Sequence, residues 1–139
     1  EGELHAFDAD RQRLAPIFER IARAGVSNAT VHAPRDDLSP LHRRMDRVVV
    51  DAPCTGAGTW RRRPDAKWRL TEKQLARRQD EQNAVLSKAA PFVRPGGFLF
   101  YITCSILNAE NGGQVERFLT QNAEFEALDA RDLFAKDHT

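Results

Sequence analysis

Two apolar runs constrain the fold of this chain more than any other feature. Residues 48–50 are three consecutive valines, and residues 98–105 read FLFYITCS. Neither run alternates apolar with polar residues, as a strand with one solvent-exposed face would. Continuous apolar runs of this kind are typical of parallel strands that helices cover on both faces of the sheet. The sequence therefore predicts an α/β fold.

The first forty residues predict a strand, a helix and a second strand. The strands are residues 3–7 and 28–33. A helix is expected between them, from Asp10 to a stop at Gly25, because apolar residues recur there on one helical face. These residues are Leu14, Ile17, Phe18 and Ile21.

Two further helices are expected in the rest of the chain. One begins at Thr71, because Thr71 and Gln74 have the spacing of a capping box. The Pro-Gly-Gly segment at residues 95–97 is expected to end that unit. The last helix follows Asn108, whose side chain can cap it.

Composition narrows the classes of protein that remain. With 139 residues and 41% hydrophobic content, the chain is expected to form one domain with one core. It has no apolar run of membrane-spanning length and no recognisable secretory signal, so we expect a cytoplasmic protein without a membrane partner. The net charge of +1 confines any basic surface to a local patch. The two cysteines lie too far apart in sequence for a typical zinc site, so no metal is expected.

Polar side chains follow three of the predicted strands. Asp8 follows the first strand, Asp51 and Cys54 follow the valines, and Cys104 ends the FLFYITCS run. In open parallel sheets, ligands bind outside the carboxyl ends of the strands. If the last two strands are neighbours, both thiols and Asp51 should open into one crevice.

The segment after Cys54 changes from glycine-rich to basic. Gly56 and Gly58 are expected to let the backbone approach a ligand closely. Beyond them, five cations are interleaved with Trp60 and Trp68, which is typical of a strip that binds RNA phosphates and stacks on bases. The cations are Arg61, Arg62, Arg63, Lys67 and Arg69. The alternative is a solvated loop with its tryptophans in the core, and we expect Trp68 to pack rather than stack.

Two motifs resemble those of the Sun family of RNA cytosine-5 methyltransferases, and most closely those of the bacterial enzymes that act on small-subunit ribosomal RNA. The motifs are DAPCTGAGTWRRRPDAKWR at residues 51–69 and GGFLFYITCSILNAENGGQVERFL at residues 96–119. The resemblance extends from AFDADRQRL through the last predicted helix. It implies a Rossmann-like fold that binds S-adenosylmethionine, and an enzyme that methylates carbon 5 of a cytosine in RNA.

The resemblance also implies roles for the residues that end the strands. Cys104 corresponds to the family's nucleophile, and Cys54 to the cysteine that assists product release. Asp51 corresponds to an acid between cofactor and base, where it would stabilise the adduct at N3 provided that it is buried. Chemistry alone would allow the two cysteines to exchange roles, because DNA cytosine-5 methyltransferases use a Pro-Cys cysteine as nucleophile.

Cofactor contacts follow from the same resemblance. Asp8 is expected to bind the ribose hydroxyls, although a helix N-cap is the alternative and Asp10 fits that role better. The family has an acid near the adenine where this chain has Arg35, so Asp36 is expected to replace it after a shift of one residue. A plain surface loop is the alternative there. Pro53, within the DAPC motif, is expected to contact the cofactor.

One part of the family pattern is missing from residues 1–139. The glycine-rich loop that holds the methionine part of the cofactor would precede residue 1, and its strand would lie between the strands at residues 3–7 and 48–50. The last strands are missing too. We therefore expect a partial catalytic domain that is inactive alone, binds the cofactor weakly and self-associates through exposed sheet edges.

Three rival classes remain open at this stage. A catalytically silent RNA-binding module would keep the basic strip but would not need two thiols at strand ends. A thiol-redox protein would need Cys54 and Cys104 to form a reversible bond. A Rossmann-type enzyme acting on a small molecule would have little use for the cations at residues 61–63.

Overall fold

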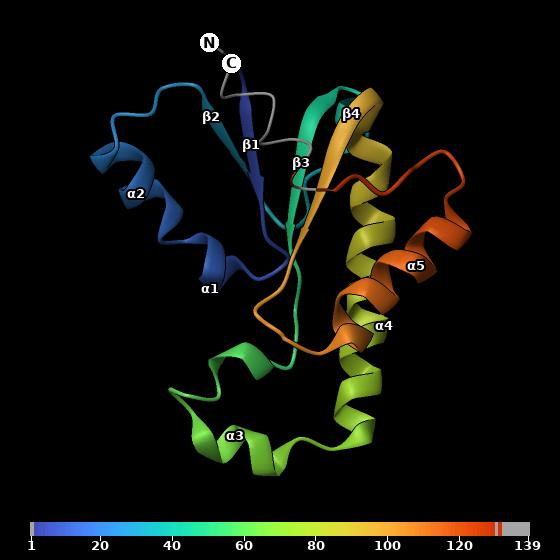
Figure 1. Ribbon diagram of the computed structural model, residues 1–139. Helices are drawn as coiled ribbons and strands as arrows, with labels where there is room; N and C mark the ends of the chain where they lie inside the picture. Colours follow the sequence, from blue (N-terminus) through green and yellow to red (C-terminus); the bar gives the residue numbers. More distant parts are fainter. Residues whose placement is uncertain (1, 130, 132–139) are drawn as a thin grey trace. The chain divides into compact units, whose positions relative to one another are not determined.

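The computed structural model describes residues 2–129 and 131 (Figure 1). The chain divides into two compact units, one within residues 1–40 and one within residues 41–139. Each unit combines helices with a pair of parallel strands, which confirms the α/β class. Within the described part of the chain, no helix is both long and apolar enough to cross a bilayer.

The first unit contains the predicted strand–helix–strand order. Strand β1 (Leu4–Phe7) pairs in parallel with β2 (Ala29–His32), and Phe7 lies opposite His32. Both strands lie inside the predicted ranges. Their carboxyl ends therefore meet at the same edge, where Asp8 and the turn after β2 follow.

The single helix predicted in this unit is wrong in one respect, because the structure contains two helices. Helix α1 (Arg11–Leu14) and helix α2 (Ile17–Arg23) are separated at Pro16. Proline has no N–H to donate to the preceding turn, so the ladder of helical hydrogen bonds is interrupted there. Asp10 caps α1, as expected, by accepting a hydrogen bond from the Gln12 N–H at 2.8 Å.

The second unit is built on β3 (Met45–Asp51) and β4 (Val93–Ile102), which pair in parallel with Asp51 opposite Ile102. This pairing confirms that the last two predicted strands are neighbours. Helices α3 (Pro64–Arg69) and α4 (Glu72–Ala89) connect the strands, and α5 (Gly112–Gln121) follows them (Figure 1). The predicted capping box at Thr71 is present at the start of α4.

The core of this unit lies between its helices and one face of its sheet. Leu86 of α4 and Ala90, the residue that directly follows α4, pack with Phe118 of α5. Partly buried residues complete the cluster: Leu99, Tyr101, Leu119 and Phe125. Burial of side chains as large as Leu86 and Phe118 contributes about 1.5–3 kcal/mol each. On the other face, Val49 and Ile102 are exposed, so the helices of this unit cover one face of its sheet.

Two predicted boundaries are wrong. Residues 95–97 do not end a unit, because β4 already begins at Val93 and runs through them with a register shift opposite Met45. Gly96 adopts a φ of 72° there, which explains how the ladder accommodates the irregularity. Asn108 does not cap the last helix either. It begins a 3-10 turn (Asn108–Glu110), and α5 starts at Gly112.

Candidate active site

The two cysteines meet just beyond the carboxyl ends of β3 and β4. Because the strands are parallel and Asp51 lies opposite Ile102, the segments that follow leave the sheet at the same edge. The Sγ atoms of Cys54 and Cys104 are 3.1 Å apart and share a hydrogen bond in which either thiol can be the donor. Both are free thiols; Cys54 is half-buried and Cys104 is exposed. A substrate can therefore reach Cys104 directly.

The environment of Cys104 favours the protonated thiol. The hydrogen bond with Cys54 raises the pKa of Cys104 above its ordinary value, and partial burial acts in the same direction. The negative charges of Cys54 and Asp51 raise this pKa further. Since the thiolate is the nucleophilic form of cysteine, a reaction at Cys104 requires that its proton be taken by another group.

Gly58 brings the Cys54 turn against the Cys104 backbone. The Gly58 N–H donates a hydrogen bond to the Cys104 carbonyl at 2.9 Å, and a Cβ at this position would lie only 2.7 Å from that oxygen. The sequence predicted a close approach of backbone to a ligand here. The close approach that the structure contains is to the second cysteine.

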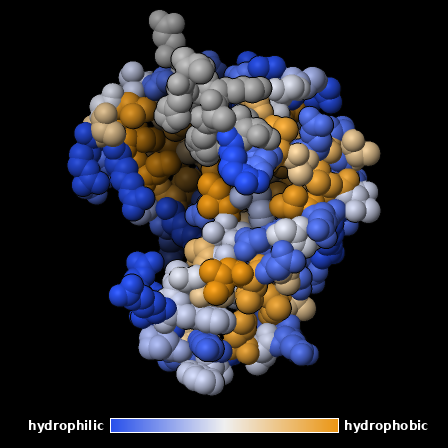
Figure 2. Space-filling view, in the orientation of Figure 1, coloured by the Kyte–Doolittle hydropathy of each residue, from blue (hydrophilic) through white to orange (hydrophobic). Residues whose placement is uncertain are grey.

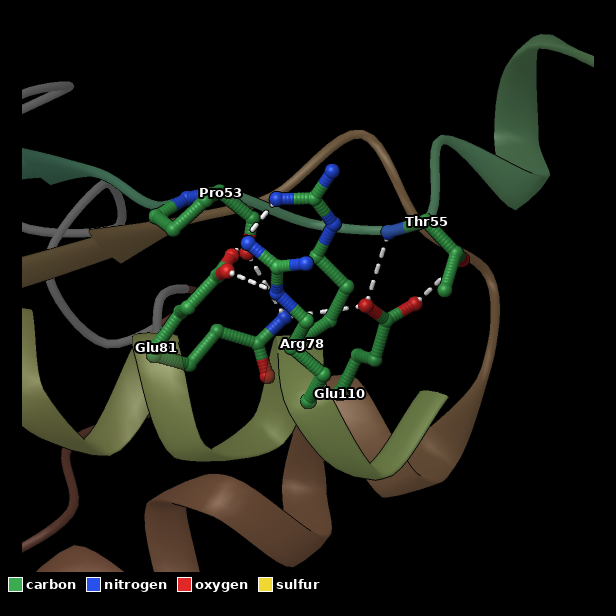
Figure 3. Close-up of polar contacts among 7 residues, drawn as sticks. Pro53, Thr55, Arg78, Glu81 and Glu110 are labelled. Atoms are coloured by element: carbon green, nitrogen blue, oxygen red, sulfur yellow. Dashed lines mark hydrogen bonds and ion pairs between the residues drawn. The ribbon is translucent and has the colours of Figure 1, made fainter. Parts of the chain in front are cut away.

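A buried carboxylate lies beneath the Cys54 turn. Glu110 is fully buried and accepts hydrogen bonds from the Thr55 N–H at 2.8 Å and the Thr55 hydroxyl at 2.5 Å (Figure 3). The Gln82 side chain, also fully buried, donates to the same carboxylate and to the Pro53 carbonyl, both at 2.9 Å. The residues directly before and after Cys54 are thus hydrogen-bonded to these two buried side chains. Sequence reasoning missed Glu110 and Gln82, because a lone acid and a lone amide in helical segments carry no local signal of burial.

Glu110 is held in its ionised form despite its burial. Burial alone would raise the pKa of Glu110, but hydrogen bonds from Ser105, Thr55 and Gln82 together outweigh it and lower the pKa below its ordinary value. The Tyr101 hydroxyl donates to the Glu110 backbone carbonyl at 2.7 Å. Burial, with the charges of Glu110 and Cys54, raises the pKa of Tyr101 to about 12. Tyr101 therefore stays a hydrogen-bond donor at neutral pH.

Glu110→Gln is expected to lower the free energy of unfolding at pH 7 by roughly 1–3 kcal/mol, because the amide offers one acceptor oxygen and leaves donors unpaired. A carboxylate with a lowered pKa stabilises the fold above its unfolded pKa, about 4.3, and this contribution is lost as the pH falls through the folded pKa. Urea unfolding at several pH values measures both effects. The difference between parent and variant should shrink in acid.

A matched control for this measurement is Glu116→Gln, which changes an exposed glutamate on α5. We expect it to alter the unfolding free energy by no more than about 0.5 kcal/mol. Equal pH dependence in the parent and in Glu110→Gln would contradict the assignment of Glu110 as a buried carboxylate.

Asp51 and Pro53, the other predicted catalytic and cofactor-binding residues of this unit, both precede Cys54 in the sequence. Asp51 ends β3 with an exposed side chain, so the burial expected for its chemical role is not present. Pro53 is half-buried, and its carbonyl is occupied by Gln82.

The predicted basic strip lies on the surface of the second unit. Its members, Arg61, Arg62, Arg63, Lys67 and Arg69, are all exposed. The loop that precedes α3 projects as a hydrophilic protrusion in Figure 2. Arg69 is paired with Asp65, which offsets part of the charge.

The expectation that Trp68 packs in the core is wrong. Its side chain is 83% exposed on the short helix α3, and the Lys67 Nζ lies 5.4 Å from its ring centroid. The same ammonium is 6.0 Å from the Trp60 ring. A cation beside two indole rings, one of them open to solvent, is an arrangement that can contact both phosphate and base.

The predicted cofactor acids lie in the first unit, and both are engaged locally. The Asp8 carboxylate accepts from the Asp10 N–H, and the Asp36 carboxylate accepts from the Ala33 N–H, each at 2.7 Å. A pocket near the carboxyl ends of β1 and β2 is lined mainly by apolar side chains. Its lining is Ala9, Arg11, Leu14, Ala15, Phe18, Val31, Ala33, Pro34 and Arg35. Among the described residues, no group of three or more potential ligands could hold a metal ion.

Comparison with known proteins identifies the family. The family model described as "16S rRNA methyltransferase RsmB/F" matches residues 1–137. The ribosomal RNA small subunit methyltransferase B of Salmonella arizonae is 36% identical over 128 residues, which are 89% of this chain and 29% of the relative. Its counterpart from Erwinia tasmaniensis is 33% identical over 137 residues, 96% of this chain and 32% of that protein. The chain thus spans about a third or less of these relatives.

Solved structures agree with this likeness. The crystal structure of PH0851 matches with a TM-score of 0.81 and 32% identity, over 94% of this chain and 30% of that one. A methyltransferase homologue from Pyrococcus horikoshii matches with a TM-score of 0.68 and 31% identity, over 88% of this chain and 37% of that one. With its two motifs in the matched region, the chain belongs to the RsmB/F family of 16S ribosomal RNA methyltransferases.

Proposed function

We propose that the protein carrying this chain transfers a methyl group from S-adenosylmethionine to carbon 5 of a cytosine in ribosomal RNA. Residues 1–139 would supply part of its catalytic domain. The observation that carries this proposal is the 3.1 Å approach of two thiols at the ends of adjacent parallel strands, one of them exposed. The substrate would place the enzyme in the cytoplasm.

The chemistry needs two groups that act in sequence on the base. The Cys104 thiolate adds to carbon 6 of the cytosine, and the electrons of the 5,6 double bond make carbon 5 nucleophilic. Asp51 would share a proton with N3 to stabilise this adduct. After methyl transfer, a base removes the proton from carbon 5, the double bond forms again, and Cys104 leaves as the thiolate. Cys54, in hydrogen-bond contact with Cys104, would assist that elimination.

The cofactor supplies an electrophilic methyl group. The pocket of the first unit fits the adenosine part, because the exposed ring of Phe18 and the apolar side chains of Leu14 and Val31 offer a surface for an aromatic base. Asp8 would bind the ribose at the end of β1. Asp36 would reach the adenine edge only by releasing the Ala33 N–H, and cofactor contact by Pro53 stays a prediction. Weak binding by this chain alone and self-association through strand edges stay predictions.

RNA binding by the basic strip is testable by salt dependence. Replacing Arg61, Arg62 and Arg63 by alanine removes three exposed cations, and each phosphate contact to a single strand contributes about −0.7 to the slope of log affinity against log salt. We expect this slope to become less negative by about two, measured by fluorescence anisotropy with a single-stranded RNA oligonucleotide. Arg77→Ala with Arg78→Ala is the matched control, because both guanidinium groups are paired with Glu81. Equal slopes in the two variants would argue for a small-molecule substrate.

The rival classes differ in how well they fit these observations. A silent RNA-binding module gains nothing from an exposed Cys104 in contact with Cys54. A reversible disulfide is favoured by the same 3.1 Å distance, and mass measurement with and without reductant separates it from covalent methyl transfer.

A further inference from the structure

Glu110 and its neighbour Asn111 have no part in the chemistry proposed above, yet they are among the most heavily bonded side chains of the second unit. Glu110 is fully buried as a carboxylate with a lowered pKa. A buried charge costs several kcal/mol unless hydrogen bonds satisfy it. The four donors that satisfy Glu110 therefore indicate which segments this residue holds.

One of these donors is the Ser105 side chain, directly after Cys104, and the other three fix the backbone around Cys54. Two of them, the N–H and the hydroxyl, belong to Thr55, which directly follows Cys54. The third belongs to Gln82 of α4, whose amide also holds the carbonyl of Pro53, directly before Cys54 (Figure 3). The backbone on both sides of this cysteine is thus fixed to one buried carboxylate and its partner amide.

Asn111 brackets Cys104 in the same way. Its side-chain oxygen accepts a hydrogen bond from the Thr103 hydroxyl at 2.6 Å, and its amide nitrogen donates to the Ser105 carbonyl at 2.9 Å. Thr103 and Ser105 are the residues directly before and after Cys104. Two consecutive residues of one short segment therefore hold the two cysteine turns: Asn111 holds the Cys104 turn, and Glu110 holds the Cys54 turn and also contacts Ser105.

We propose that Glu110 and Asn111 form a positioning pair that sets the separation of the Cys54 and Cys104 thiols. Neither residue touches the substrate; each acts through the turn that it holds. Because the two side chains are adjacent in sequence, a shift of one turn relative to the other requires breaking buried hydrogen bonds. The importance of this separation for catalysis rests on the proposed function, but the separation itself does not.

The test is the rate at which iodoacetamide alkylates Cys104 in this 139-residue chain, followed by mass spectrometry from pH 6.5 to 10. The charged or titratable groups that act on this thiol are Cys54 and Asp51. Contact with Cys54 favours the protonated form of Cys104, so Cys54→Ala should move the profile to lower pH and raise the rate at pH 7.5 at least about threefold. Glu110→Ala and Asn111→Ala should do the same, because the thiols separate.

The matched control is Gln114→Ala. Gln114 is also a buried amide that donates to a backbone carbonyl of α4, that of Gln79 at 2.5 Å, and neither residue adjoins a cysteine. Its alkylation rates should stay within about 1.5-fold of those of the parent.

The circular dichroism spectrum of each variant that is compared must match that of the parent. If Glu110→Ala does not fold, Thr55→Val removes only the hydroxyl donor, and Thr55→Ser should restore the parental profile.

The proposal would be overturned if Glu110→Ala folds and keeps the parental alkylation profile while the Cys54→Ala profile is shifted. Where Glu110→Ala does not fold, the same result for Thr55→Val would overturn it. An unshifted Cys54→Ala profile would overturn it too, because the thiols would then not be in contact in solution. No RNA or cofactor enters this experiment. Failure of the proposed methyl transfer would therefore leave the alkylation profiles unchanged and is distinguishable from failure of the positioning pair.

Discussion

Replacing Cys104 by alanine in the complete protein that carries this chain is expected to abolish both methylation and the covalent RNA adduct. Without the thiolate, carbon 5 of cytosine is too weak a nucleophile to take the methyl group, so no product should be detectable. The measurement is transfer of labelled methyl groups to RNA, with denaturing electrophoresis for the adduct. Exposed Cys104 has few contacts to lose, so the variant should fold as the parent does.

Replacing Cys54 by alanine should fail in a different way. Attack and methyl transfer remain available through Cys104, but elimination is impaired, so a protein–RNA species should accumulate and survive denaturing electrophoresis. The contrast between the two variants is the expected result. Trapping by Cys104→Ala and not by Cys54→Ala would exchange the two roles, as in the DNA enzymes. Full activity of both variants without trapping would rule out covalent catalysis.

Gly58→Ala is expected to have the second-largest effect on activity. The new methyl group would lie 2.7 Å from the Cys104 carbonyl oxygen and would push the two cysteine turns apart. We expect a loss of roughly 1–3 kcal/mol in stability and a fall of about 100-fold in methyl transfer, the cost of misplacing a reacting group by about 1 Å. Chemical unfolding and initial rates measure these effects.

The control for Gly58→Ala is Gly25→Ala. A Cβ at Gly25 would meet no atom within 4 Å, and its cost is only that of a left-handed residue, about 1–2 kcal/mol. Comparable stability loss with undiminished methyl transfer is expected for Gly25→Ala. Undiminished transfer in Gly58→Ala as well would mean that the close approach of the two turns has no bearing on the reaction.

Local patterns were enough to predict the strands and the meeting of the thiols. The apolar runs at residues 48–50 and 98–105 lie largely in β3 and β4, and their parallel pairing brings Cys54 to Cys104. The capping box at Thr71 was readable because its partner lies three residues away. These features depend on near neighbours in the sequence or on the common direction of parallel strands.

Features that depend on long-range packing were not predictable in the same way. The bonds from Glu110 to Thr55 and Gln82 join residues 55 and 28 positions apart, and nothing around a single glutamate shows where it will be buried. The exposure of Trp68 follows from the position of α3 and not from its sequence. The break at Pro16 follows from the proline itself, whereas the apolar spacing around it predicts one continuous helix.

The central claim, that Cys104 is the nucleophile, is tested most directly by finding the residue that carries the trapped nucleotide. The Cys54→Ala protein is incubated with S-adenosylmethionine and substrate RNA, denatured, and digested with nuclease and trypsin. Trypsin should release residues 89–117, which contain Cys104, as one peptide, since the bond after Arg94 precedes a proline. We predict a methylated cytidine nucleotide on Cys104 in this peptide. A nucleotide on any other residue, or a trapped species formed by Cys104→Ala with the nucleotide on Cys54, would contradict the account.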